Sequence, residues 1–149
     1  LRFDDYLPFD AEAADNIARE CGMFALPLDL GEVVVTSAGG MDYPFLVHCV
    51  VSGLGSPPTD LNAIAVSLSS ALRSAAKSKC KSVAMVIPAM AVDGFFNPPA
   101  DRVLEVVFET INRLNSLDKL ESIEALLIYC PPNTEEAVAP VAKLYLSED

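Results

Sequence analysis

Apolar residues along the chain follow two different periods, and together they predict a series of strands and helices. Short runs rich in β-branched residues predict strands at residues 32–37, 45–51, 82–87 and 124–130. Apolar positions that repeat every three to four residues predict helices at residues 11–21, 60–78, 98–117 and 134–146. From residue 45 onward, the pattern therefore alternates between strand and helix.

Residues with known capping preferences mark the ends of the later helices. Asn97 stands where an N-cap side chain is expected, and Pro98 occupies the favoured first helical position. Asn133 and Glu136 have the spacing of a capping box for the last helix. Pro140 lies inside that helix and predicts a bend there, because proline removes one helical hydrogen bond.

The lengths of the connections predict an α/β fold. Residues 38–44 are too few for a parallel crossover, so we expect the first two strands to be antiparallel. The later strands are joined through helices, and right-handed crossovers make such strands parallel. The expected architecture is a three-layer α/β/α domain with a mixed, mostly parallel sheet and helices on both faces. Ligands of such sheets bind at the carboxyl ends of the strands, here residues 52–58, 88–97 and 131–133.

Composition and charge limit the class of protein. With 52% apolar residues, residues 1–149 can form one domain with a well-buried core. The net charge of −11 argues against nucleic acid and anionic membranes as partners, because phosphates are bound by clustered Lys and Arg. The longest apolar run, residues 83–92, is interrupted by Pro88 and is shorter than the ~20 residues of a membrane span. No basic, apolar leader is evident, so we expect an intracellular protein, either cytoplasmic or nuclear.

The cysteines and the single histidine indicate neither a metal site nor a disulfide framework. Cys21, Cys49, Cys80 and Cys130 show no Cys-x-x-Cys spacing, and His48 is the only histidine. We expect free thiols, buried in the case of Cys49 and Cys130, with no metal and no cofactor. His48 and Cys130 are better interpreted as core residues than as a base and a nucleophile, because no motif links them to a catalytic partner.

Two segments resemble the macro domain family, whose members hold ADP-ribose. One reads VVVTSAGGM and continues, after a short gap, with PFLVHCV; the other reads KSVAMVIPAM and precedes a loop with Phe and Pro and an amphipathic helix. The resemblance covers residues 4–145 and implies a cleft for ADP-ribose or a related nucleotide. The positions that it assigns to this cleft are Ser37, Gly39, Gly40, Gly53, Gly55, Val92, Asp93, Gly94, Phe95, Phe96 and Asn97.

The same comparison predicts that the phosphate pocket is eroded. The family's first strand is not evident before Asp10, so it either lies upstream of the chain or is absent from the protein. Residues 7–10 contain no glycine where the family has a glycine loop, and only Gly94 remains in the loop at residues 91–98. Asp93 stands where bare backbone should approach phosphate. A carboxylate ~4 Å from a diphosphate charge repels it by roughly 1 kcal/mol in water and about 4 kcal/mol at an effective dielectric of 20.

These observations favour a non-catalytic module that recognises a ligand or a protein through a macro-like fold. Three alternatives stay open. The first is a functional ADP-ribose-binding domain, and the second is an enzyme that removes ADP-ribose from proteins, whose catalytic positions would lie largely in the missing strand and glycine loop. The third is the macro-like N-terminal domain of leucyl aminopeptidases, which the sequence VSGLG before a long helix resembles. Phe95 and Phe96 either stack on a ligand or fill the cleft.

Overall fold

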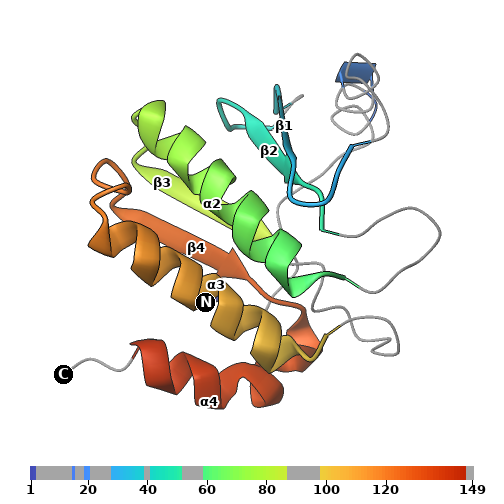
Figure 1. Ribbon diagram of the computed structural model, residues 1–149, viewed down its shortest axis with the longest axis vertical. Coiled ribbons are helices and arrows are strands. Elements are labelled where there is room, and N and C mark those ends of the chain that lie inside the picture. Colours follow the sequence, from blue (N-terminus) through green and yellow to red (C-terminus); the bar gives the residue numbers. More distant parts are fainter. Residues whose placement is uncertain are drawn as a thin grey trace.

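The computed structural model describes residues 1–2, 15, 19–20, 28–38, 41–51, 59–86 and 98–146 (Figure 1). It confirms the α/β class expected from the sequence. In chain order the described elements, with the labels of Figure 1, are β1 (Val33–Thr36), β2 (Leu46–Cys49), α2 (Leu61–Lys77), β3 (Ser82–Val86), α3 (Ala100–Ser116), β4 (Ala125–Tyr129), the 3₁₀ helix η2 (Pro132–Thr134) and α4 (Glu135–Leu146).

The first two strands form the antiparallel pair that the short connection predicts. Their register places Val34 opposite His48 and Thr36 opposite Leu46. The β-branched residues of β1 favour extended backbone, and their alternation buries Val34 and Thr36 while Val35 stays exposed. β1 therefore ends on a buried threonine, directly before the exposed Ser37.

The last two strands pair in parallel through the α3 crossover, also as predicted. Their register runs from Ser82 opposite Ala125 to Val86 opposite Tyr129. Near the amino terminus, the Arg2 N–H donates to the carbonyl of Ile128 at 2.8 Å and forms a parallel bridge at the end of β4. One face of the β3–β4 pair belongs to the main apolar core, through the side chains of Val83, Met85, Leu126 and Ile128.

Helix α2 links the antiparallel strand pair to the rest of the core. Asp60 begins the helix as its N-cap, because its Oδ1 accepts the backbone N–H of Ala63 at 3.0 Å. The helix packs against α3 on one side and against β1 and β2 on another (Figure 1). Its buried residues follow the predicted helical spacing: Ala63, Ile64, Ser67, Leu68, Leu72 and Ala75.

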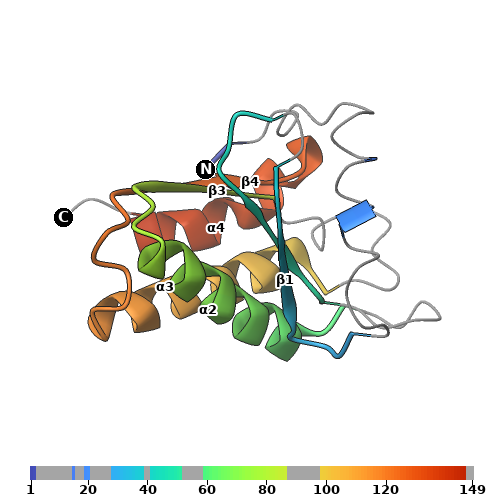
Figure 2. The same ribbon diagram turned by 90° about the horizontal axis from the view of Figure 1, so that it is seen from above.

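The three long helices lie on the same side of the β3–β4 pair (Figure 2). The central helix α3 contributes Val103, Leu104 and Val107 to the core, each at most 1% exposed. α4 packs on α3, where the rings of Phe108 and Tyr145 stack with their centroids 5.2 Å apart. Pro140 lies inside α4, as the sequence indicates.

The three-layer architecture also predicts helices on the opposite face of this strand pair, and residues 11–21 are expected to be helical. Asp15, Arg19 and Glu20 are the described residues of that range, and all three are helical. On this face Leu127 is 37% exposed. The coverage of the second face therefore stays a prediction.

The described strands form two pairs, where the order of elements suggests neighbouring parallel strands from residue 45 onward. Among the described residues, β2 pairs with β1 and β3 pairs with β4, and no pairing joins β2 to β3. A crossover helix fixes the direction of a strand but not its neighbour, and consecutive strands are adjacent in roughly two-thirds of cases.

Strand β2 is less buried than its apolar sequence predicts. Leu46, Val47 and His48 are half-buried, and Cys49 is exposed, which corrects its interpretation as a buried thiol. In the described part of the chain β2 is paired along one edge, so it lacks the enclosure of a central strand. Cys130 is buried as predicted. It is free, as are Cys49 and Cys80, whereas Cys21 lies outside the described residues.

Two predicted helix starts are also wrong. α3 begins at Ala100 rather than Pro98, with Pro99 as its N-cap residue, because a residue that precedes a proline is disfavoured in helical backbone. Asn133 does not cap the last helix. It lies in the 3₁₀ turn η2, and α4 starts only at Glu135.

Candidate functional site

The structure places one of the predicted cleft residues, Ser37, and the others lie outside the described residues. Those others are Gly39, Gly40, Gly53, Gly55, Val92, Asp93, Gly94, Phe95, Phe96 and Asn97. The geometry of the candidate site is therefore that of the end of β1, where Ser37 follows the strand. Whether the remaining positions gather around it stays a prediction.

Ser37 binds the carboxylate of Glu20 through two hydrogen bonds. Its backbone N–H donates to Glu20 Oε2 at 2.7 Å, and its hydroxyl donates to Glu20 Oε1. The two donors thus converge on one anionic group, which is the arrangement of an anion-binding turn. These bonds lower the pKa of Glu20 below its usual 4.5, the hydroxyl bond contributing most and the backbone N–H next.

Sequence reasoning did not identify Glu20. It lies 17 residues before Ser37, inside a predicted helix whose remaining positions carry no recognised site. No motif connects the two positions, and their contact depends on how the helical segment packs against the end of β1.

Thr36 and His48 form a second polar contact beside the first. Thr36 is buried, and its Oγ1 lies 2.9 Å from His48 Nε2 and 2.9 Å from the carbonyl oxygen of Ser37. A hydroxyl carries one hydrogen, and the Ser37 carbonyl can only accept. The Thr36 hydroxyl therefore donates to that carbonyl and accepts a hydrogen bond from His48 Nε2–H.

The electrostatics of this group keep His48 neutral and Glu20 charged. Burial of the ring lowers the pKa of His48 below 6.5, and the Glu20 carboxylate offsets part of that effect. A neutral imidazole whose Nε2 donates to threonine has no free acceptor at that nitrogen. Glu20, with its lowered pKa, is a weak base toward the Ser37 hydroxyl. The two donors of Ser37 therefore hold an anionic group at the end of β1.

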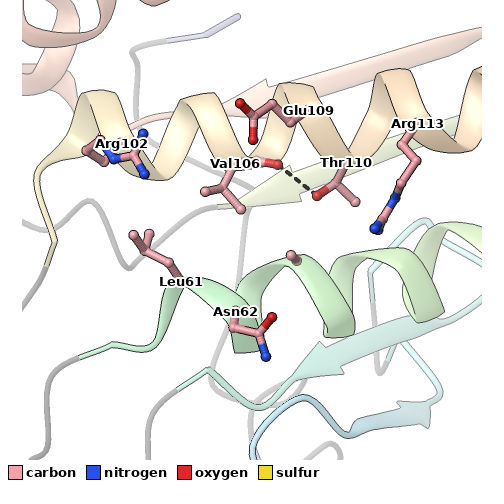
Figure 3. A pocket seen from close by; sticks show the side chains of 8 residues that line it. Leu61, Asn62, Arg102, Val106, Glu109, Thr110 and Arg113 are labelled. Atoms are coloured by element: carbon pink, nitrogen blue, oxygen red, sulfur yellow. Dashed lines mark hydrogen bonds between the residues drawn. The ribbon is translucent and has the colours of Figure 1, made fainter.

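A shallow groove of about 360 Å³ lies between α2 and α3, on their solvent side (Figure 3). Arg113 reaches from α3 toward α2 and donates to Ser69 Oγ at 2.9 Å, while Arg102 pairs with Glu105. The groove is lined by Leu61, Asn62, Ala65, Arg102, Val106, Glu109, Thr110 and Arg113. The guanidinium groups of Arg102 and Arg113, at its two ends, already bind other side chains, so we interpret the groove as part of the packing between the two helices.

Two other kinds of feature are absent from the part of the chain that the structure describes. No cluster of three or more His, Cys, Asp or Glu side chains that could hold a metal ion occurs among the described residues. None of the helices in the described ranges is both long and apolar enough to cross a membrane.

Comparison with known proteins assigns the family. The model of the family described as Macro domain matches residues 8–107, about two-thirds of the chain. The chain belongs to the macro domain family. Two curated relatives, the uncharacterized proteins Rv1899c of Mycobacterium tuberculosis and Mb1934c of Mycobacterium bovis, are each 32% identical to it over 87 residues. These matches cover 58% of this chain and 23% of each relative, so the chain spans about a quarter of the length of these proteins.

Solved macro domains share the fold of this chain. The macro domain of ganglioside induced differentiation associated protein 2 is 16% identical with a TM-score of 0.63, and the match covers 79% of this chain and 58% of that one. A mutant macrodomain from Oceanobacillus iheyensis is 18% identical with a TM-score of 0.60, over 89% of this chain and 67% of that one. At these identities the likeness shows the fold, and it confirms the macro-like architecture.

Proposed function

We propose that this macro domain is a non-catalytic recognition or interaction module whose pocket for ADP-ribose or a related nucleotide is eroded. The observation that carries the proposal is the binding of Glu20 by Ser37. A converging backbone N–H and hydroxyl are the donors that a phosphate requires. Here a carboxylate of the protein itself occupies both donors, so an incoming phosphate would have to displace it.

The sequence of the loop at residues 91–98 supports the same proposal. It retains only Gly94, and Asp93 brings a second carboxylate to the place where the family brings backbone close to phosphate. With a net charge of −11, the protein also offers little compensating positive potential. Phe95 and Phe96 then serve to fill the cleft rather than to stack on a nucleotide.

The Thr36–His48 contact supports a non-catalytic role. The only histidine of the chain uses Nε2 to donate to a buried threonine, so this nitrogen is not available to accept a proton from water or from a hydroxyl. The proposal therefore expects no release of ADP-ribose from a modified protein.

A retained ADP-ribose-binding function is the second candidate, and the family match favours it. Residues 8–107 include every predicted cleft position from Ser37 to Asn97. In this reading Asp93 turns away from the phosphates and Glu20 is displaced by the ligand.

For the interaction role, the partner suited to this surface is a basic or neutral protein, because a net charge of −11 attracts cationic surfaces. An intracellular location in the cytoplasm or nucleus is part of this proposal. Neither nucleic acid nor a membrane surface belongs to it, since both carry the same sign of charge as the protein.

Isothermal titration of ADP-ribose into the wild-type protein separates the two candidates. The eroded pocket predicts no saturable heat up to ~1 mM ligand, which corresponds to a binding free energy weaker than about −4 kcal/mol. A micromolar dissociation constant would establish the second candidate instead. Release of ADP-ribose from a modified protein, followed in parallel, would contradict the non-catalytic role.

A further inference from the structure

Helix α4 leaves most of its apolar side chains uncovered. Val138 is its single fully buried residue, although the helix reads EEAVAPVAKLYL. Leu144 is 73% exposed, the largest value among the exposed large hydrophobic residues of the described chain, and Leu146 is 52% exposed. α4 lies at the outer edge of the molecule, with α3 on its inner side (Figure 1).

Part of this uncovered surface forms a stripe along one face of the helix, whereas the exposed Leu146 lies on the opposite face. Ala137, Pro140, Val141 and Leu144 are spaced at i, i+3, i+4 and i+7, so they share one face of the helix. Ala137, Pro140 and Leu144 are exposed, and Val141 is half-buried where the stripe meets the core. We call these four residues the α4 stripe. Within the described ranges, no element covers its exposed members.

One acidic and one basic residue border the stripe, and their positions would allow two copies of the helix to pair opposite charges. Glu136 and Lys143 are seven residues apart, so they lie on the same flank of the helix, and both are exposed. The acidic residue stands in the first turn and the basic residue in the last. In an antiparallel pair of identical helices, a flank faces the same flank of the partner, which brings Glu136 of each copy next to Lys143 of the other.

We propose that the α4 stripe is the contact surface for a second copy of this chain, in a two-fold antiparallel helix pair. The small Ala137 of one copy then lies opposite the large Leu144 of the other, and Pro140 lies near the two-fold axis. The helix dipoles are antiparallel and two Glu136–Lys143 contacts form at once. The inference is independent of any ligand in the pocket.

The expected dimer is weak. One short helix from each copy covers less than the roughly 800 Å² per partner of a standard stable interface. The net charge of −11 on each copy adds repulsion, which physiological salt screens beyond about 8 Å. A dissociation constant on the order of 100 µM in 0.15 M salt is therefore expected.

Sedimentation equilibrium of the wild-type protein and of two single-charge variants tests the proposal. Glu136→Lys and Lys143→Glu each place like charges together in the pair, and each should weaken self-association roughly tenfold. An equimolar mixture of the two variants restores both contacts, because one chain then carries two lysines and the other two glutamates. Recovery of dimer in the mixture, to about the wild-type level, is the expected result.

Leu144→Glu should abolish the dimer by placing a charge in the stripe. The matched control is Leu117→Glu, because Leu117 is 58% exposed on another element, next to the end of α3, and this variant should dimerise like the wild type. Circular dichroism confirms that each variant is folded. A wild-type protein that is monomeric at 500 µM (about five times the expected constant) would overturn the proposal. So would a dimer that persists in Leu144→Glu, or a mixture that associates no better than its components.

Discussion

At the residue scale, the buried hydroxyl of Thr36 connects the end of β1 to β2. It accepts from His48 Nε2 at 2.9 Å and donates to the Ser37 carbonyl at 2.9 Å. Thr36→Val keeps the shape and removes both bonds, so the free energy of unfolding should fall by about 1–3 kcal/mol, measured by urea denaturation. Thr36→Ser retains the hydroxyl and is the control, so it should lose less stability than Thr36→Val; a Thr36→Val protein as stable as the wild type would contradict this role of the hydroxyl.

His48 should make the protein less stable at mildly acidic pH. Its pKa in the folded protein lies below the ordinary 6.5 because of burial. As pH falls through 6.5, the unfolded chain takes up a proton before the folded protein does, so the stability present above that pH is progressively lost. Titration of the single imidazole resonance by NMR measures the shift directly.

Glu20→Gln provides the check on this pH effect. Glu20 is the charge that raises the pKa of His48 against the effect of burial, so removing that charge should lower the pKa of His48 further. A pKa of 6.5 or more for wild-type His48 would contradict the account, as would an increase in the variant.

The candidate site could be predicted only in part, for reasons that lie at this scale. Ser37 was predicted because the run VVVTSAGGM resembles the macro domain family. Glu20 was missed because its contact with Ser37 joins two segments 17 residues apart, and nothing in the local sequence specifies how they pack. Local patterns reveal turns and strand ends, whereas partners brought together by tertiary packing have no local signal.

At the element scale, the start of α2 depends on one side chain. Asp60 accepts the Ala63 N–H at 3.0 Å and satisfies one of the free donors of the first turn. Asp60→Ala should lower the free energy of unfolding by about 1 kcal/mol, measured by thermal or urea denaturation. Asp60→Asn retains the capping oxygen and should be nearly neutral; a full loss in Asn would show that charge, rather than the cap, stabilises the helix.

Most elements were predicted within two residues because their signals are local. The β-branched runs specify β1 and β3, and the apolar stripes specify α2 and α3. The errors have local or tertiary causes. The helix α3 starts later than predicted because Pro98 precedes another proline. Strand β2 is less buried than predicted because its burial depends on neighbouring elements, which its own sequence does not specify.

At the scale of the whole molecule, the fold is that of a macro domain, and the proposed function combines this fold with an eroded diphosphate pocket. Glu20 occupies the donors of Ser37, and Asp93 adds a second carboxylate in the sequence of the phosphate loop. The proposal is physically consistent, because packed helices and strands can persist when anion-binding residues change.

Replacement of Asp93 by glycine isolates the effect of the second carboxylate. The proposal places this carboxylate ~4 Å from the diphosphate, so its removal should recover between about 1 and 4 kcal/mol of binding free energy, depending on the local dielectric. Asp118→Asn changes the net charge of the protein by the same amount, in the turn after α3, and serves as the matched control. It should leave the affinity for ADP-ribose unchanged.

The most direct test of the eroded pocket is the ADP-ribose affinity of Asp93→Gly, measured by isothermal titration beside the wild type and Asp118→Asn. The account predicts that Asp93→Gly binds at least about fivefold more tightly than the wild type, a gain of roughly 1 kcal/mol or more, while Asp118→Asn does not. Tight binding by the wild type, with no gain in Asp93→Gly, would contradict it.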